Sequence, residues 1–269
     1  MKILITADPE LPVPPVYYGG IERIVDGLVR EFVQMGHEVG LVANPASTSP
    51  ATTLFGWPGA TSQSKSDTVR NIVALNSAVK TFRPDVIHSF SRLAYLTPQL
   101  LSKTPKIMSY QRHVGGRQIS SAAKLGGRSL QFTGCSEFIC AMGRPSGGTW
   151  HAIPNFVETD KCPFTDKVAA DAPLLFLSRI ETIKGADMAI RIARRAGRRL
   201  VLAGNHSSSP AEAEYWKQKI EPEIGKDGIS YAGEVNDKTK WPLLAAAAAM
   251  LVPIQWDEPF GIVFAEALA

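Results

Sequence analysis

The chain has 269 residues and a net charge of +4, and 45% of its residues are hydrophobic against 20% that are charged. This length fits two compact domains or one large one, and the composition excludes a disordered chain. The small positive excess suits phosphate-bearing ligands and does not indicate a nucleic-acid partner. The three cysteines, at positions 135, 140 and 162, form no CxxC pair. We therefore expect no disulfide framework, no zinc site and a cytoplasmic location.

Strands and helices alternate in the first part of the chain. Residues 2–6 form an apolar, strand-like run that is too short for a secretory signal or a membrane span. Gly19 and Gly20 precede apolar residues at helical spacing, and residues 39–43 form a second strand before a loop rich in Pro, Ser and Thr. The further elements predicted here are a helix over 67–82, a strand over 86–88, a helix after Ser91, and strands over 106–110, 129–133 and 149–153.

A second alternating series follows a proline-containing segment at about 155–173. Its predicted elements are strands over 174–177, 199–203, 229–231 and 250–253, and helices over 185–196, from 211, through 242–248 and from 260. Two such series predict mostly parallel sheets with helices on both faces, and thus two Rossmann-like domains over 1–160 and 171–269. Because the chain stops at Ala269 within the last predicted helix, we expect the second domain to be incomplete.

Two carboxylates near the end of the chain form its strongest local feature. Glu258 opens the run Glu-Pro-Phe-Gly and is separated from Glu266 by seven residues. The run follows a predicted strand, and open α/β sheets bind ligands at the carboxyl ends of their strands. Carboxylates suit sugar and ribose hydroxyls, and Gly261 leaves helix amides open to an anion. The alternative is a pair of acids that only stabilise a helix N-terminus.

Two cations lie one strand–helix series earlier. Arg179 follows the predicted strand 174–177, and Lys184 precedes the next helix. In these positions they can hold a diphosphate and stabilise the charge that develops when it leaves. An isolated Arg and Lys would instead be read as solvated surface charges, but the carboxylate pair makes these two complementary to it.

Seven segments in sequence order resemble the retaining GT-B glycosyltransferases of family 4. They are 18–23 (YGGIER), 84–88 (PDVIH), 153–157 (IPNFV), 178–185 (SRIETIKG), 202–205 (LAGN), 231–235 (YAGEV) and the 258–266 motif. The resemblance covers nearly the whole chain and implies two domains facing each other across a cleft, with the acceptor mainly on the N-terminal side. Ser178 stands where the family commonly has Gly, and we expect the turn at Arg179 to be kept. The loop 205–210 is rich in Ser instead of ending in the usual glycine.

The resemblance also implies roles for individual residues. Arg179 and Lys184 would hold the donor diphosphate, and Glu266 would bind the ribose hydroxyls. Glu258 would hold hydroxyls of the transferred sugar. The remaining donor-binding residues are the backbone around Phe260 and Gly261 at the sugar, Glu234 and Val235 beside the base, and Gly19 and Gly20 over the phosphates.

His113 resembles the family's histidine near the sugar and acceptor, although a lone histidine is more often structural. Arg112 and Arg117 flank it, and they either meet an acidic acceptor or are solvated surface charges. Gly19 and Gly20 let backbone approach an anion closely, the alternative being a plain turn before a helix.

These patterns together predict an enzyme that transfers a sugar from a nucleotide-diphosphate donor, expected to be a UDP-sugar such as UDP-glucose, with retention at the anomeric carbon. The expected acceptor is a sugar, a lipid or another small molecule, with peripheral membrane contact as a further option. Because the sequence contains no Asp-x-Asp, we expect no metal and no cofactor. The alternatives are a sugar-nucleotide epimerase or hydrolase of the same fold, or a non-catalytic nucleotide-sugar-binding protein. A nicotinamide-dependent oxidoreductase is disfavoured because no GxGxxG follows the first strand.

Overall fold

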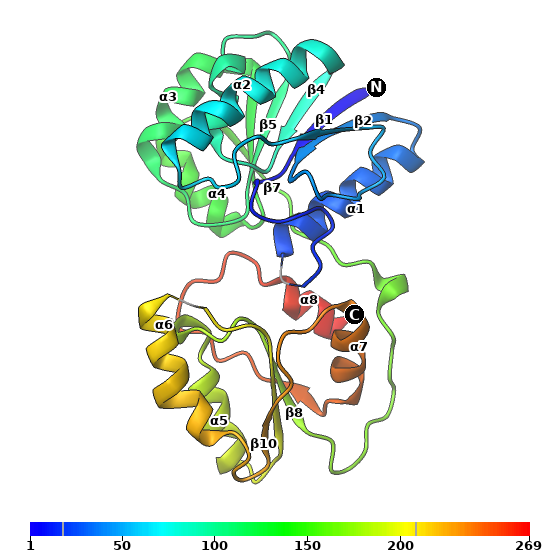
Figure 1. The fold of residues 1–269 in the computed structure, drawn as a ribbon, viewed down its shortest axis with the longest axis vertical. Helices are drawn as coiled ribbons and strands as arrows, with labels where there is room; N and C mark the ends of the chain where they lie inside the picture. Colours follow the sequence, from blue (N-terminus) through cyan, green and yellow to red (C-terminus); the bar gives the residue numbers. More distant parts are fainter. Residues whose placement is uncertain (18, 208) are drawn as a thin grey trace. The chain divides into compact units, whose positions relative to one another are not determined.

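The computed structural model of the protein describes residues 1–17, 19–207 and 209–269; Tyr18 and Ser208, from two of the segments discussed above, lie outside the described residues. The chain divides into two compact units, Met1–Phe156 and Val157–Ala269, which are both drawn in Figure 1. Phe156 belongs to the first unit because its ring packs on Gly27, where an added Cβ would come within 2.7 Å of it. The sequence placed the two domains at 1–160 and 171–269.

A parallel sheet of seven strands forms the centre of the first unit, in the order β3-β2-β1-β4-β5-β6-β7. The strands are β1 (Lys2–Thr6), β2 (Glu38–Ala43), β3 (Thr53–Gly56), β4 (Val86–Ser89), β5 (Lys106–Tyr110), β6 (Leu130–Gly134) and β7 (Thr149–Ala152). The chain runs outward from β1 to β3 and then returns to the other side of β1. The reversal creates a switch point between β1 and β4, which is where open α/β sheets bind ligands.

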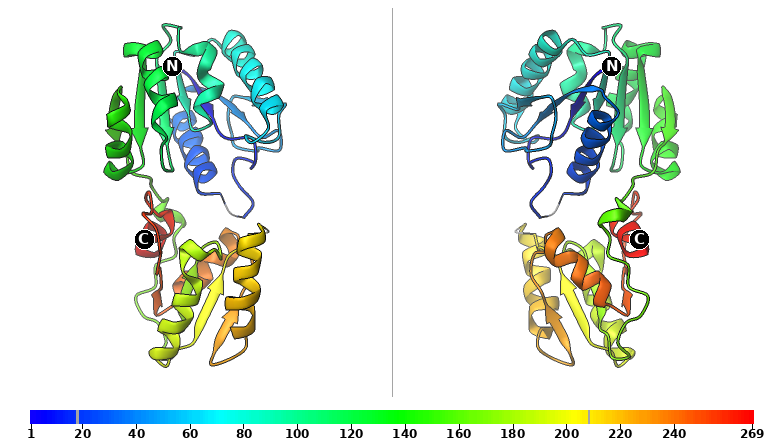
Figure 2. Two further views of the ribbon diagram at one scale, coloured as in Figure 1. Left: turned by 90° about the vertical axis from the view of Figure 1, so that its left-hand side faces the viewer. Right: turned by 90° about the vertical axis from the view of Figure 1, so that its right-hand side faces the viewer.

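Helices cover the sheet of the first unit (Figure 2). They are α1 (Gly20–Gln34), α2 (Lys65–Phe82), the 3-10 helix η1 (Leu93–Gln99), α3 (Gly116–Gly126) and α4 (Glu137–Gly143). Leu4 of β1 packs in one core cluster with α2, η1 and α3. Ile3 and Ile5 are also buried and point to the opposite face, because side chains alternate along a strand.

The structure corrects the sequence reading of the first unit at several elements. β3 lies within the segment predicted to be a loop, and its residues alternate between partly buried and exposed because it is an edge strand paired only with β2. The helix predicted after Ser91 is the 3-10 helix η1, which contains Pro98. Helices α3 and α4 were not predicted: α3 begins directly after Gly115, and α4 is only seven residues long.

A smaller parallel sheet forms the centre of the second unit, in the order β10-β9-β8-β11. Its strands are β8 (Leu174–Leu177), β9 (Leu200–Ala203), β10 (Ile229–Tyr231) and β11 (Ala249–Met250). All four residues of β8 are buried, as expected for a parallel strand covered on both faces. The predicted strand 250–253 is a strand only at its first residue, although the Leu251 amide still donates to the Leu175 carbonyl.

Two pairs of helices cover this smaller sheet, as Figure 1 shows. They are α5 (Ala186–Arg195), α6 (Pro210–Tyr215), α7 (Asp237–Ala246) and α8 (Ile262–Leu268). The first pair, with the π-helical turn Trp216–Ile220 that extends α6, packs on the face of Phe176. The second pair packs on the opposite face, around Leu175 and Leu177. This unit therefore has one core on each side of β8.

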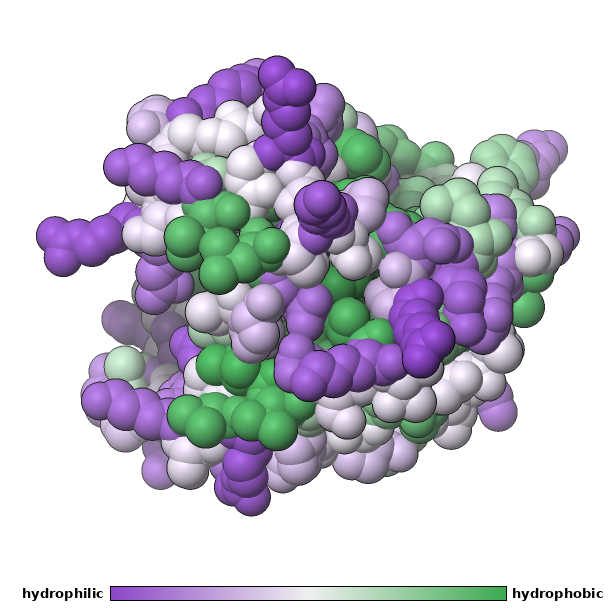
Figure 3. Space-filling model, turned by 90° about the horizontal axis from the view of Figure 1, so that it is seen from above, coloured by the Kyte–Doolittle hydropathy of each residue, from purple (hydrophilic) through white to green (hydrophobic). Residues whose placement is uncertain are grey.

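The described part of the chain contains no helix that is long and apolar enough to cross a bilayer. Large apolar side chains are nevertheless exposed on the first unit, among them Met35, Leu101 and Leu125. On the face seen in Figure 3, polar side chains interrupt the apolar areas.

Candidate active site

The loop after β8 carries the two predicted cations, Arg179 and Lys184. It ends in a backbone conformation that requires glycine. Arg179 follows the strand and donates to the Glu181 carboxylate at 2.5 Å, and a 3-10 turn (Thr182–Lys184) then ends at Gly185. Gly185 has φ +76°, and an added Cβ would lie 2.1 Å from the Pro253 carbonyl oxygen. The close approach to Pro253 brings the loop after β8 next to the loop after β11.

Ser178 is compatible with the turn at Arg179. Its amide donates to the Ala203 carbonyl at 3.1 Å and so continues the pairing of β8 with β9. Among the described residues, Ser178 is not one of the non-glycine residues with positive φ, so its backbone does not require glycine. The steric demand falls on Gly204, where an added Cβ would lie 2.0 Å from the Ser178 carbonyl oxygen.

Lys184 and Glu258 contact each other directly, which unites the two features that the sequence singled out separately. The lysine ammonium lies 2.5 Å from a Glu258 carboxylate oxygen, and both side chains are largely buried. The Trp256 indole N–H donates to the same oxygen at 2.8 Å, and the ammonium lies 4.9 Å from the centre of the indole ring. Lys184 and Glu258, together with the Trp256 side chain that contacts both, are called the first lysine–glutamate pair below. The sequence analysis missed Trp256, whose closeness to Glu258 was the available signal.

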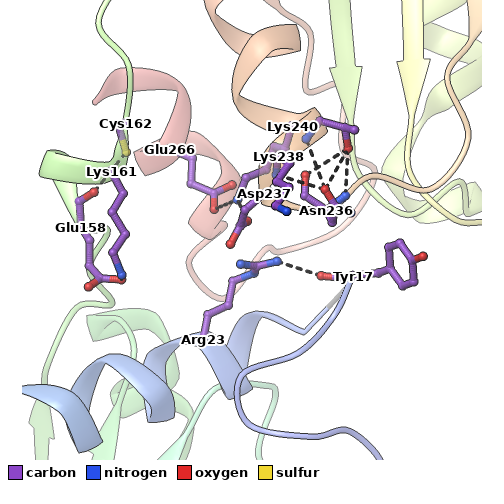
Figure 4. A network of polar contacts seen from close by, with 11 residues as sticks. Tyr17, Arg23, Glu158, Lys161, Cys162, Asn236, Asp237, Lys238, Lys240 and Glu266 are labelled. Carbon is purple, nitrogen blue, oxygen red and sulfur yellow. Dashed lines mark hydrogen bonds and ion pairs between the residues drawn. The ribbon is translucent and has the colours of Figure 1, made fainter. Parts of the chain in front are cut away.

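Glu266, which the resemblance assigns to the ribose hydroxyls, contacts a lysine of the neighbouring helix. It lies on α8, and its carboxylate accepts from the Lys240 ammonium of α7 at 2.5 Å. Lys240 also lies 3.0 Å from the Asp237 carboxylate and 4.3 Å from the centre of the Trp241 ring. Figure 4 shows the Glu266 carboxylate directed toward this group. Lys240 and Glu266 are called the second lysine–glutamate pair, together with the side chains that contact Lys240, which are Asp237 and Trp241.

The second pair is more deeply buried than the first. The side chains of Lys240 and Glu266 are 8% and 10% exposed, against 11% and 18% for Lys184 and Glu258. Burial is the main cause of the raised pKa of the Cys162 thiol, and the nearby negative charge of Glu266 raises this pKa further. Sequence reasoning missed Lys240 because a lysine in a mixed polar helix carries no signal of burial.

Helix α6 anchors the cation-bearing loop from a distance of about thirty residues in sequence. The Glu212 carboxylate accepts from the Thr182 amide at 2.7 Å and from its hydroxyl at 3.2 Å. The Tyr215 hydroxyl donates to the Asp187 carboxylate at 2.8 Å, and burial raises the pKa of this tyrosine. These contacts fix both ends of the turn that carries Lys184, and no local pattern in the sequence indicated them.

The remaining donor-side residues also lie at carboxyl ends of strands in the second unit. The Gly233 carbonyl, after β10, accepts from the Gly204 amide at 2.8 Å. Glu234 is exposed, whereas Val235 packs into the core around Leu175. Gly261, with φ +76°, is the N-cap of α8, which begins two residues later than Phe260, where the sequence placed its start.

Gly19 and Gly20 form the start of α1 in the first unit. An added Cβ on Gly19 would lie 2.5 Å from the Cβ of Pro15, so this close approach requires glycine. Gly20 is the first helical residue, and the Arg23 guanidinium donates to the Tyr17 carbonyl at 2.9 Å (Figure 4).

His113 lines a cavity of about 640 Å³ in the first unit. Its ring meets the edge of Phe138 at a centroid distance of 5.6 Å. Asp8 lines the same cavity, accepts from the Arg92 amide at 3.1 Å and from the Arg112 guanidinium at 2.7 Å, and has its pKa raised chiefly by burial. Asp8 follows β1 and Arg92 follows β4, so the cavity lies at the switch point between these two strands.

The described residues bring no group of three or more His, Cys, Asp or Glu side chains together as a metal-binding cluster. The second unit places cations, carboxylates and backbone amides at the carboxyl end of its parallel sheet. That combination suits a ligand with a diphosphate and several hydroxyl groups.

Two family models match the chain. The model described as Glycosyltransferase Family 4 matches residues 18–161, and the model described as Glycosyl transferases group 1 matches residues 164–269. The protein is therefore a glycosyltransferase enzyme. Because the first of these models spans more than half of the chain, the protein belongs to glycosyltransferase family 4. The family, the enzyme class and the α/β GT-B fold predicted from the sequence are thereby confirmed.

Solved structures agree with this assignment. A glycosyltransferase involved in avilamycin A biosynthesis is 26% identical, with a TM-score of 0.71, and the match covers 99% of this chain and 75% of that one. Sucrose-phosphate synthase from Thermosynechococcus elongatus is 17% identical with a TM-score of 0.77, over 99% and 78% of the two chains. Anabaena HepE in complex with UDP-glucose is 16% identical with a TM-score of 0.72, over 100% and 78%. No curated protein sequence gives a significant match.

Proposed function

We propose that this glycosyltransferase uses a UDP-sugar as donor and transfers the sugar with retention at the anomeric carbon. The observation that carries the proposal is the direct contact of Lys184 with Glu258 at the carboxyl end of the second sheet, on the loop after β8 that also carries Arg179. A cation that binds the leaving diphosphate therefore lies next to a carboxylate that can accept from sugar hydroxyls. The bound UDP-glucose in HepE supports the choice of donor.

The proposed chemistry follows from where charge develops. As the bond to the sugar breaks, negative charge grows on the diphosphate, and fixed cations stabilise that charge more in the transition state than in the ground state. Lys184 has three donor hydrogens, so it can keep its contact with Glu258 while it donates to phosphate oxygens. Arg179 adds a planar guanidinium suited to the same oxygens.

The second pair is proposed to hold the nucleoside. An ionised carboxylate has room for several acceptor contacts, so Glu266 can accept from ribose hydroxyls while Lys240 holds its other oxygen. Glu234 and Val235 are proposed to lie beside the base, and Phe260 and Gly261 at the sugar. Gly19, Gly20 and His113 keep their predicted roles at the phosphates and the acceptor as part of this proposal. Catalysis is proposed to need no metal and no cofactor.

The proposal is tested by incubating the chain with UDP-glucose, ADP-glucose and GDP-mannose in the presence of a panel of sugar and lipid acceptors. The expected result is UDP-dependent transfer, with an α-linked product from the α-linked donor, read from the anomeric coupling in the proton NMR spectrum. Equal turnover with EDTA present is expected as well. A β-linked product would contradict retention, and free sugar formed equally with and without acceptors would indicate a hydrolase instead.

A further inference from the structure

The cavity of the first unit contains positive charge that the donor chemistry does not use. Its lining includes three arginines, Arg92, Arg112 and Arg117, and one carboxylate, Asp8. Arg92 follows β4, Arg112 follows β5, and Arg117 lies in the first turn of α3, so separate segments bring guanidinium groups to one cavity. The sequence analysis left two alternatives open for Arg112 and Arg117, contact with an acidic acceptor or solvated surface charges.

Asp8 neutralises one of the three arginines. It contacts the Arg112 guanidinium at 2.7 Å and is itself largely buried, so this contact fixes Arg112 at the cavity wall. Glu10 and Glu22 lie near enough to interact electrostatically with Asp8, and burial raises the pKa of both Asp8 and Glu22.

Arg92 and Arg117 have no such partner. Within residues 1–17, 19–207 and 209–269, neither guanidinium makes a hydrogen bond or an ion pair with a carboxylate. Two other exposed arginines of the first unit do have one: Arg70 pairs with Asp67, and Arg144 pairs with Glu137. The cavity therefore combines one matched and two unmatched guanidinium groups.

Backbone geometry adds to the same polarity. Gly115 and Gly116 line the cavity at the start of α3, an eleven-residue helix whose N-cap makes no side-chain hydrogen bond. The amides of its first turn carry the positive end of the helix dipole. This feature supports the arginines and does not replace them.

We propose that the acceptor carries an anionic group, a phosphate ester or a carboxylate, which Arg92 and Arg117 bind in this cavity. The inference rests on the proposed transfer function and specifies the substrate class of its acceptor side. Guanidinium groups form paired, charge-assisted hydrogen bonds with both kinds of anion, and these are stronger than hydrogen bonds to neutral hydroxyls. An acceptor with hydroxyls alone would leave the two groups unused.

The test follows backbone amides of the full chain by NMR while three probes are added separately at constant ionic strength: inorganic phosphate, acetate and glucose. We expect phosphate, acetate or both to shift the amides of residues 115–118, and glucose at the same concentration to leave them unchanged. A response to phosphate alone assigns a phosphate ester, and a response to acetate alone assigns a carboxylate.

The variant R92Q/R117Q should bind the responding anion about 100-fold more weakly, at roughly tenfold for each charge-assisted contact. The matched control R128Q, in the 3-10 turn that follows α3 and outside the cavity lining, should bind it as the wild-type chain does. Absence of a shift with either anion, or equal affinity in R92Q/R117Q and R128Q, would overturn the inference. UDP added to R92Q/R117Q should still shift the amides of Gly185 and Gly261, and failure there would contradict the donor site instead.

Discussion

The two lysine–glutamate pairs of the second unit are built alike and differ in what surrounds them. In each, a lysine ammonium lies 2.5 Å from a carboxylate and near the face of a tryptophan. In the first, the Trp256 indole and Lys184 both donate to one oxygen of Glu258. In the second, one ammonium is shared by two carboxylates and is more deeply buried. From this comparison we propose that the first pair serves the reacting diphosphate, whereas the second supports the fold and holds Glu266, the carboxylate proposed to bind the ribose.

The largest expected effect comes from breaking the second pair with Lys240→Met. The substitution leaves Glu266 buried without its cation, and such losses cost about 3–5 kcal/mol of folding free energy. Denaturant unfolding should show this loss, together with weaker UDP binding. The control Lys238→Met changes an exposed lysine of the same helix and should unfold like the wild-type chain. Equal free energies of unfolding for the two variants would contradict a structural role of the second pair.

Breaking the first pair should act on catalysis more than on stability. We expect Lys184→Ala to lower kcat/KM for donor transfer by about 10²–10³-fold, the usual loss when one group that stabilises developing charge is removed. Initial-rate kinetics measure this loss. Lys217→Ala, an exposed lysine of the same unit, is the control and should leave the rate unchanged. A rate loss below about threefold for Lys184→Ala would be incompatible with a diphosphate role.

A smaller effect is expected from loosening the loop that carries Lys184. Glu212→Gln weakens the two hydrogen bonds that hold Thr182, so kcat/KM should fall about tenfold, from the loss of roughly 1.5 kcal/mol of charge-assisted contact. Glu214→Gln, on the same helix, provides the comparison, because the Glu214 carboxylate accepts from Gln218 in the π-helical turn that extends α6. If both variants react at the same rate, α6 does not position the loop.

The smallest expected effect separates the two tryptophans. Trp256→Phe keeps a ring under Lys184 but removes the N–H that donates to Glu258, and the loss of about 1 kcal/mol should lower kcat/KM about fivefold. Trp241→Phe, in the second pair, removes an N–H with no hydrogen bond to Lys240 or Glu266 and should leave the rate nearly unchanged. The opposite ranking would reverse the roles assigned to the two pairs.

Much of the fold was predictable because buried parallel strands appear in the sequence as continuous apolar runs. The bounds predicted for β1 and β8 agree with the structure for this reason, and those predicted for β5 and β10 agree as well. The edge strand β3 was missed because half of its side chains face solvent. Helix α3 was missed because it starts at two glycines and buries only a few small or apolar residues.

The site was predictable only where a local motif carried it. Arg179, Lys184, Glu258 and Glu266 stood out by their spacing after strands. Their contacts could not be predicted, because the pairing of Lys184 with Glu258 joins residues 74 positions apart. Lys240 looked like any lysine of a surface helix, and it is buried only because α8 packs beside α7 and brings Glu266 to it.

The most direct test of the two-pair account compares UDP with uridine as ligands in NMR competition experiments. The account predicts that Lys184→Ala weakens UDP binding at least tenfold and leaves uridine binding unchanged, because only the diphosphate contacts the first pair. Glu266→Gln should weaken both ligands to the same extent, because both contain the ribose. Equal losses of UDP and uridine binding in Lys184→Ala, or full uridine affinity in Glu266→Gln, would contradict the assignment of the two pairs.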